Sequence, residues 1–216
     1  MNVPAPAVPT ASPGLRLAAW LFDTALASVP AAAIAAVLTM PARLRLMELE
    51  PESLEHSMLL LTYLTELMWV TLQQLGLFVT FLVVIYGVGS VVAESGFHQA
   101  TWGKRLVGLR VETVEGRDLT WQQALARFAA GTLSWGTLNI GHAMGRFRDD
   151  RRMLHDLASN TRVTQEPMDR RGRGVAWCLG GWLAVSLLLS AATPVDPVVA
   201  RLIEATQTQG PQLLAH

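Results

Sequence analysis

The sequence predicts an all-α membrane protein with three transmembrane helices, an interfacial or re-entrant helical segment and a small cytoplasmic β-hairpin. Three uncharged runs carry this prediction, because residues 24–42, 67–93 and 174–195 contain no Asp, Glu, Lys or Arg over 19, 27 and 22 positions. Each run is close to the roughly 20 apolar residues that cross the hydrocarbon core of a bilayer. The rest of the chain holds every charged side chain, and there is one cysteine, Cys178. This composition argues against a soluble domain and a disulfide scaffold.

The first apolar segment, about residues 17–40, is expected to be a retained transmembrane helix. A cleaved signal peptide has a basic head and an apolar stretch of about 7–15 residues. Here the residues before the segment contain no positive charge until Arg16, and the run is longer. Pro30 predicts a break or kink, and Pro41 predicts the end of the helix. Residues 1–13 are expected to be a flexible tail.

The second span is predicted over about residues 70–93. Apolar residues begin earlier, at Ser57, but Glu66 interrupts them. A single helix from Ser57 to the end of this span would be about 55 Å long, much longer than the bilayer core is thick. We therefore interpret the first part as an amphipathic or extramembrane lead-in. Two spans that turn near Gln73-Gln74 are the alternative.

A β-hairpin is predicted over residues 104–120. The stretch RLVGLRVET alternates apolar and polar residues, Glu115-Gly116 provides a turn signal, and LTW follows as the second strand. The later segment TRVTQ, residues 161–165, is a candidate third strand.

The distribution of Lys and Arg predicts the topology, because cytoplasmic loops carry an excess of these residues. If the amino terminus is cytoplasmic and residues 121–145 do not cross, 14 basic residues lie inside and 3 outside. If residues 121–145 do cross, the balance becomes 7 against 10. We therefore expect residues 121–145 to lie in the interface or to form a re-entrant segment. The remaining predicted parts are a basic cytoplasmic loop over 146–174, a last span over 175–193 and a short tail over 194–216.

Asp23 is the one charge inside the first span, where a carboxylate costs about 2.5–3.5 kcal/mol. Arg16 lies on the same helix face two turns earlier, about 10 Å along the axis, which is long for a direct ion pair. Asp23 is therefore expected to meet an arginine from elsewhere, with Arg127 as the leading candidate. Asp23 is then either a buried structural anchor or a carboxylate that responds to cations or protons.

Three motifs in this order resemble the RDD family of bacterial membrane proteins. They are RLAAWLFD at the start of the first span, TWGKRLVGLRVETVEGRDLTWQQALARF, and RRMLHDLASNTRV. The resemblance covers roughly residues 14–165. Arg16 and Asp23 match the arginine and first aspartate of the family name by position, and Asp156 matches the second. Trp102 stands where the family often has proline. Other residues that fit the family pattern are Gly103, Lys104, Arg105 and Thr161.

The resemblance implies a protein of the bacterial cytoplasmic membrane whose activity is mostly unassigned in the family. Some members have been proposed as monovalent cation/proton exchangers and others as assembly partners in membrane complexes. The preferred hypothesis is a non-enzymatic module that organises or stabilises a membrane complex through a polar network of Arg16, Asp23, Arg127 and Asp156. The alternative is an oligomeric exchanger with Asp23 as the titrating carboxylate.

The expected partners are the lipid bilayer, anionic lipid head groups at the basic cytoplasmic loops, and either another membrane protein or a second copy of the chain. No cofactor or metal is expected, because His98, His142 and His155 are isolated in the sequence. Nucleic acid is not expected either, because the basic run RFRDDRRMLHD contains three acids. The GKR triplet lacks the preceding glycine and the Ser or Thr of a phosphate-binding loop.

Overall fold

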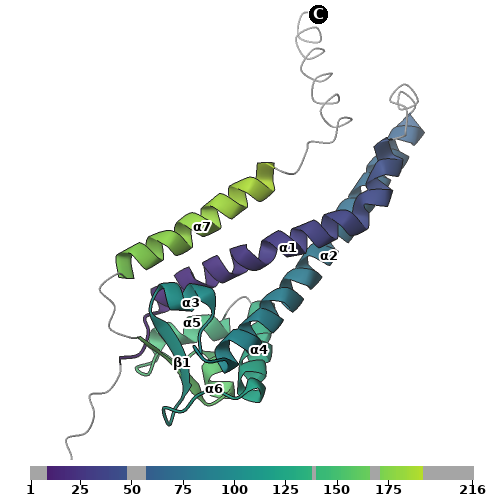
Figure 1. Ribbon diagram of the computed structural model, residues 1–216. Helices are drawn as coiled ribbons and strands as arrows, with labels where there is room; N and C mark the ends of the chain where they lie inside the picture. Colours follow the sequence, from purple (N-terminus) through teal and green to yellow (C-terminus); the bar gives the residue numbers. More distant parts are fainter. Residues whose placement is uncertain (1–8, 48–56, 138–139, 166–170, 192–216) are drawn as a thin grey trace, which may run out of the picture.

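The computed structural model describes residues 9–47, 57–137, 140–165 and 171–191 (Figure 1). Three of its helices are long and apolar enough to cross a membrane: α1 (Pro13–Met47), α2 (Ser57–Ser95) and α7 (Arg171–Ala191). They contain the first two predicted spans and residues 175–191 of the third; residues 192–193 of that span and the predicted tail over 194–216 lie outside the described residues. The class of protein expected from the uncharged runs is therefore confirmed.

Helix α1 is longer than predicted. It continues through both Pro30 and Pro41 and ends at Met47, so Pro41 does not terminate it and Pro30 does not break it. A proline removes one backbone hydrogen bond, and membrane helices tolerate this loss because neighbouring groups compensate for it.

Helix α2 is a single element of 39 residues, which excludes a turn near Gln73-Gln74 and joins the predicted lead-in to the span. The amide of Gln74 is used between helices, because its Oε1 accepts a hydrogen bond from Arg43 Nη1 of α1 at 3.3 Å. Hydroxyls along the same helix donate to carbonyls four residues earlier, as Thr71 does to Leu67 at 2.8 Å. The polar residues of this segment are thus accommodated without interrupting the helix.

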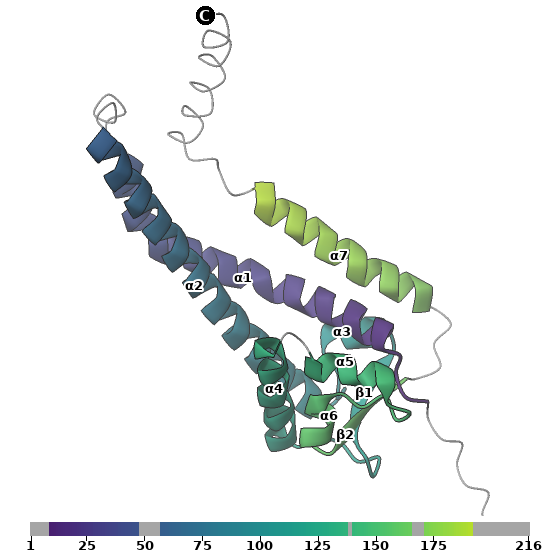
Figure 2. The same cartoon turned by 180° about the vertical axis from the view of Figure 1, so that it is seen from behind.

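The remaining elements gather at the end of the molecule where α1 and α7 begin and α2 ends (Figures 1 and 2). We call this region the polar end. Its two strands form an antiparallel sheet in which Leu109 is opposite Gln165 and Thr113 is opposite Thr161. Its elements are α3 (Trp102–Leu106), β1 (Leu109–Thr113), α4 (Trp121–Gly136), α5 (Ile140–Phe147), α6 (Leu154–Ala158) and β2 (Thr161–Gln165).

The small sheet is confirmed, but the predicted hairpin over 104–120 is wrong in its second strand. The turn signal is correct, since Gly116 has φ of 80° and Thr113 N donates to the Arg117 carbonyl at 2.9 Å. Beyond this contact at Arg117, residues 118–120 form no second strand beside β1. Leu119 N donates instead to Gln99 Oε1 at 2.5 Å. The partner of β1 is the predicted third strand, β2.

The residues before α1 extend the sheet. Ala11 N donates to the Val163 carbonyl at 2.9 Å, and Gln165 N donates to the Pro9 carbonyl at 3.0 Å. Thr10 forms a bridge with Thr164. Residues 9–11, which the sequence assigns to a flexible tail over 1–13, are therefore held along β2, and residues 1–8 of that tail lie outside the described residues.

Two short helices occupy the predicted interfacial or re-entrant segment 121–145. Helix α4 has 16 residues and α5 has 8, fewer than the roughly 20 that a span requires. Thr120 caps the start of α4, since its hydroxyl accepts from Gln123 N while the Gln123 side chain accepts from Thr120 N. The exposed side of both helices is mostly apolar, as a segment against lipid requires, with Gln122 and Arg146 as exposed polar residues. The exposed apolar side chains include Trp121, Leu125, Leu133, Ile140 and Phe147.

Small residues allow α1, α3 and α7 to approach one another closely. A Cβ at Gly103 would overlap the carbonyl of Ala19 on α1, and a Cβ at Gly174 would overlap the carbonyl of Leu106. Ala19 itself is completely buried. Backbone contact of this kind is typical of helix packing in membranes.

Gly174→Ala tests this docking of α7, with Gly180→Ala as the matched control on the same helix. Gly180 has open space where a Cβ would be, whereas the Cβ at Gly174 must displace backbone. We expect Gly174→Ala to destabilise the protein by about 1–3 kcal/mol. We expect Gly180→Ala to have no effect or to stabilise by up to about 1 kcal/mol. Heat unfolding of the detergent-purified chain measures both, and equal melting temperatures would contradict the close contact.

Candidate functional site

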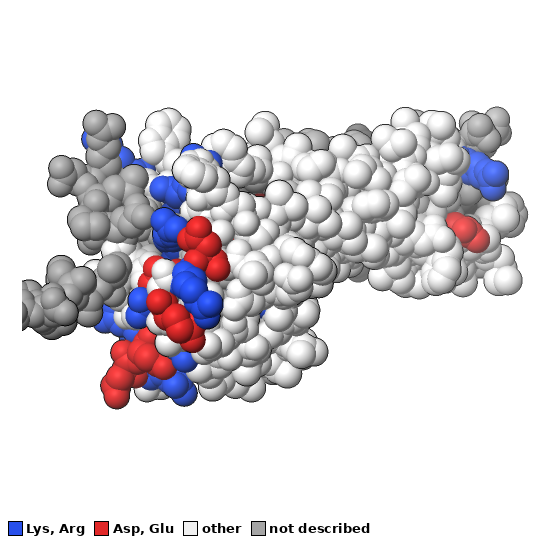
Figure 3. All heavy atoms as spheres, turned by 60° about the horizontal axis from the view of Figure 1, so that its bottom comes forward, with Lys and Arg blue, Asp and Glu red and all other residues white. Residues whose placement is uncertain are grey.

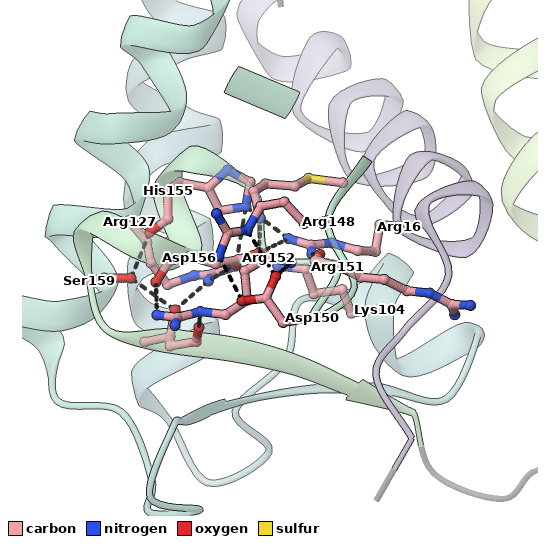
Figure 4. Close-up of polar contacts among 12 residues, drawn as sticks. Arg16, Lys104, Arg127, Arg148, Asp150, Arg151, Arg152, His155, Asp156 and Ser159 are labelled. Atoms are coloured by element: carbon pink, nitrogen blue, oxygen red, sulfur yellow. Dashed lines mark hydrogen bonds and ion pairs between the residues drawn. The ribbon is translucent and has the colours of Figure 1, made fainter. Parts of the chain in front are cut away.

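The carboxylate of Asp156 is the centre of the polar end (Figure 4). It is completely buried between the first transmembrane helix and α4. Arg16 Nη2 lies 2.7 Å from Asp156 Oδ2, and Arg127 Nη1 pairs with Oδ1. Burial opposes ionisation of Asp156, but the charges of Arg16 and Arg127 outweigh it and hold the pKa of the carboxyl well below its usual range.

A second carboxylate extends these contacts to two more helices. Arg127 Nε donates to Glu94 Oε2 at 3.0 Å, and Lys104 pairs with Glu94 Oε1. Five charged side chains from α1, α2, α3, α4 and α6 are thus connected. We call Arg16, Glu94, Lys104, Arg127 and Asp156 the buried ion-pair network; it contains three cations and two carboxylates.

Neutral groups satisfy further donors around this network. Arg127 Nη1 donates to Thr161 Oγ1 at 2.6 Å, and Ser159 Oγ lies 2.8 Å from the same oxygen. Arg152 donates to the backbone carbonyls of Thr161 and Asp156, at 3.0 and 3.2 Å. Met153 N donates to Asp156 Oδ2 at 2.8 Å, which fixes the start of α6 on the same carboxylate.

Asp23 does not pair with Arg127, so this sequence-based expectation is wrong. Thr101 Oγ1 donates to Asp23 Oδ2 at 2.5 Å, and Gly103 N donates to Oδ1 at 2.7 Å. Asp23 therefore caps the first turn of α3 from the neighbouring helix α1. The Arg127 guanidinium is occupied by Glu94 and Asp156.

Three of the four other motif residues take part in these contacts. Gly103 provides both the close approach to α1 and an N–H for Asp23. Lys104 pairs with Glu94, and Thr161 accepts from Arg127. Arg105 is different, because it is exposed and its guanidinium lies 4.9 Å from the ring centre of Trp102.

The model of the RDD family matches residues 10–160, well over half of the chain. The chain belongs to the RDD family. Comparison with curated proteins and with solved structures gave no match. In this RDD protein, the two aspartates assigned by position have different roles. Arg16 and Asp156 form one ion pair, while Asp23 caps α3.

Glu94 is the network residue that sequence reasoning missed. It is buried although it directly follows the 27-residue uncharged run, at the end of α2. The same reasoning that singled out Asp23 applies to it, because a carboxylate at the end of an apolar span needs a partner if it does not reach water. Its two partners, Lys104 and Arg127, come from later in the chain.

Asp156→Asn tests the energetic weight of the network, with Asp150→Asn as the control. The substitution leaves two buried guanidinium groups without their shared countercharge, which is expected to destabilise by about 3–5 kcal/mol. Asp150 pairs with Arg148 at 2.9 Å at the surface, where the loss is expected to be about 0–1 kcal/mol. Chemical or thermal unfolding in detergent measures both variants.

The ion pairs of Asp156 with Arg16 and Arg127 also predict that the stability of the protein depends on pH. Because the folded-state pKa of Asp156 is lowered, its stabilisation is present above the unfolded-state pKa of about 3.9 and decreases as the pH falls below that value. The difference in the free energy of unfolding between wild type and Asp156→Asn should be constant from about pH 5 to about pH 8 and should become smaller at lower pH. A difference that varies across the neutral range would contradict this assignment.

Proposed function

We propose that this RDD protein is a non-enzymatic module that organises or stabilises a membrane complex. The observation that supports this role is the pairing within the buried ion-pair network. Each of its five charges meets an opposite charge of the same chain, and together they join five helices. Such an arrangement fixes how helices meet.

The proposed location is the bacterial cytoplasmic membrane, with the amino terminus and the polar end on the cytoplasmic side. Charged side chains gather at the polar end and leave a long uncharged middle, with few charges at the opposite end (Figure 3). A cytoplasmic polar end agrees with the excess of Lys and Arg in cytoplasmic loops. It also places the exposed Arg146 and Arg148 where anionic lipid head groups are available.

Helix α7 provides a surface for a partner helix. Ala176, Gly180 and Ala184 follow one another at intervals of four residues and are all exposed. They line a shallow hollow of about 450 Å³. Small residues at this spacing allow a second transmembrane helix to approach closely, which supports assembly with a membrane protein partner or a second copy.

Gly180→Leu tests the proposed module. We expect wild-type protein, extracted from its native membranes in mild detergent, to migrate on a native gel as part of a larger assembly. Leucine fills the hollow on α7, so most of the variant should migrate as a single chain. Gly76→Leu is the control, since Gly76 is also exposed with open space beside it, on α2. Wild-type protein that migrates alone would contradict the proposal.

One observation favours the cation/proton exchanger as a second candidate. Asp23 has no ion-pair partner among the described residues, and it lines a cleft of about 750 Å³ between α1 and α2. An intramembrane carboxylate in this setting is typical of ion pathways. The surroundings are mostly apolar, including Leu26, Ile85 and Val88, which disfavours the passage of a hydrated cation.

Asp23→Asn in everted vesicles separates the two functions. The module predicts that wild-type vesicles show no Na⁺-dependent proton movement above empty vesicles. Under the exchanger hypothesis, wild type moves protons, Asp23→Asn abolishes this movement, and Glu66→Gln retains it. Glu66 is a suitable control because it is an exposed carboxylate on α2. A fluorescent pH indicator measures proton movement, and transport by wild type that depends on Asp23 would refute the module.

A further inference from the structure

A cavity of about 400 Å³ lies beside the buried ion-pair network. Its wall includes Arg16, Lys104, Arg127, Trp20, Trp135 and His155. These residues come from α1, α3, α4 and α6, so the cavity exists only because the polar end is docked on the first span. The proposed module does not use it. Pockets for small molecules usually have volumes of about 300–1,000 Å³, which makes this one suitable for a head group and the first part of a chain.

The charges on the wall favour an anion. Three cations, Arg16, Lys104 and Arg127, line the cavity, and no Asp or Glu among the described residues does; Glu94 lines the smaller cavity that adjoins it. Asp156, the carboxylate that Arg16 and Arg127 share, is completely buried and is not among the residues that line the cavity. Because the network holds three cations and two carboxylates, it has one positive charge in excess. One negative charge in the cavity would balance it.

Three buried side-chain nitrogens on the wall, Trp20 Nε1, His142 Nδ1 and His155 Nδ1, have no hydrogen-bond partner among the described residues, and two of them are N–H donors. The first is Trp20 Nε1, which can only donate. The second is His155 Nδ1. His155 Nε2 lies 3.0 Å from Arg16 Nη2 and must accept from it, because arginine only donates. Burial lowers the pKa of His155, so the ring is neutral and its single proton is on Nδ1.

Buried donors without acceptors are rare, because an unmade hydrogen bond is costly. Trp20 Nε1 and His155 Nδ1 therefore indicate that the cavity receives a group with acceptor oxygens. A metal ion does not fit this site, because His155 presents a proton and the neighbouring side chains are cations. The nearby His142 ring, 5.2 Å from that of His155 between centroids, is also a base with a lowered pKa, mainly through burial.

The rest of the wall is apolar and aromatic. Trp20 and Trp135 are in edge-to-face contact at 6.4 Å between ring centres, and Tyr86 lies 6.0 Å from Trp135. Leu17 also lines the cavity and is 55% exposed on the surface of α1, the side that faces lipid in the proposed topology. These walls suit hydrocarbon, and the position of Leu17 provides an exit for a chain towards the bilayer.

We propose that this cavity binds an anionic amphiphile, with its phosphate or carboxylate head at Arg16, Lys104 and Arg127 and its hydrocarbon chain leaving past Leu17. The head accepts hydrogen bonds from Trp20 Nε1 and His155 Nδ1. A free inorganic anion shares the head-group chemistry but would leave the apolar wall uncovered.

Calorimetric titration of the full chain in an uncharged detergent tests the proposal with three probes. They are dioctanoylphosphatidate, dioctanoylglycerol, which lacks the charge, and inorganic phosphate, which lacks the chains. We expect saturable binding of dioctanoylphosphatidate, binding of dioctanoylglycerol weaker by at least about tenfold, and no binding of inorganic phosphate at the same concentrations. Equal affinity for dioctanoylglycerol would overturn the role of the anion. Equal affinity for inorganic phosphate would overturn the amphiphile.

Trp20→Phe locates the site, because it removes the N–H while keeping an aromatic ring. We expect binding of dioctanoylphosphatidate to weaken by about tenfold, as for one lost hydrogen bond to a charged group. The control, Trp177→Phe, changes an exposed tryptophan on α7 outside the cavity and should bind as wild type does. Trp20→Phe should also melt no lower than wild type, since it removes an unpaired buried donor. Equal binding by the two variants would overturn the site. The binding assays do not depend on any complex, so their failure is distinct from failure of the proposed module.

Discussion

The contact between Asp156 and the arginines Arg16 and Arg127 is the interaction on which the polar end depends. Helices α4, α5 and α6 have 16, 8 and 5 residues, lengths at which helices are marginal or unstable by themselves. They acquire stability by packing on the long helices. One buried carboxylate connects α6 to both α1 and α4, and the cost of burying these charges is offset only while all three groups are together.

Charged and small residues divide the work of joining the helices. The buried ion-pair network specifies which helices meet, while Gly103 and Gly174 determine how closely α3 approaches α1 and α7 approaches α3. Asp23 contributes to the close approach of α3 to α1, because it accepts a hydrogen bond from the N–H of Gly103, the residue that contacts the α1 backbone. Outside the polar end, the helices expose long apolar faces, which is the expected surface where the solvent is hydrocarbon.

What the sequence predicted well is local in the chain. The three spans follow from uncharged runs, and the turn at Gly116 follows from its neighbours. Strand pairing is not local: alternation identified β1 and β2 as strands but could not show that they pair across about 50 intervening positions. The ion pairs are not local either. Arg16, Arg127 and Asp156 could be expected to belong to a polar network, but the sequence could not show which charges meet. The pairing of Arg127 with Asp23 was therefore predicted wrongly, and Glu94 was missed.

The charge balance of the polar end links its architecture to the cavity. If the buried ion-pair network served packing alone, equal numbers of cations and carboxylates would be sufficient, and its net charge would be zero. Here Asp23 is held by a hydroxyl and a backbone N–H, so it does not neutralise a network cation by direct contact. The excess positive charge therefore stays beside Trp20 and His155, whose buried donors face the same space. The contacts that hold the short helices on α1 thus also create a site with the polarity of an anion receptor and the walls of a lipid-binding pocket.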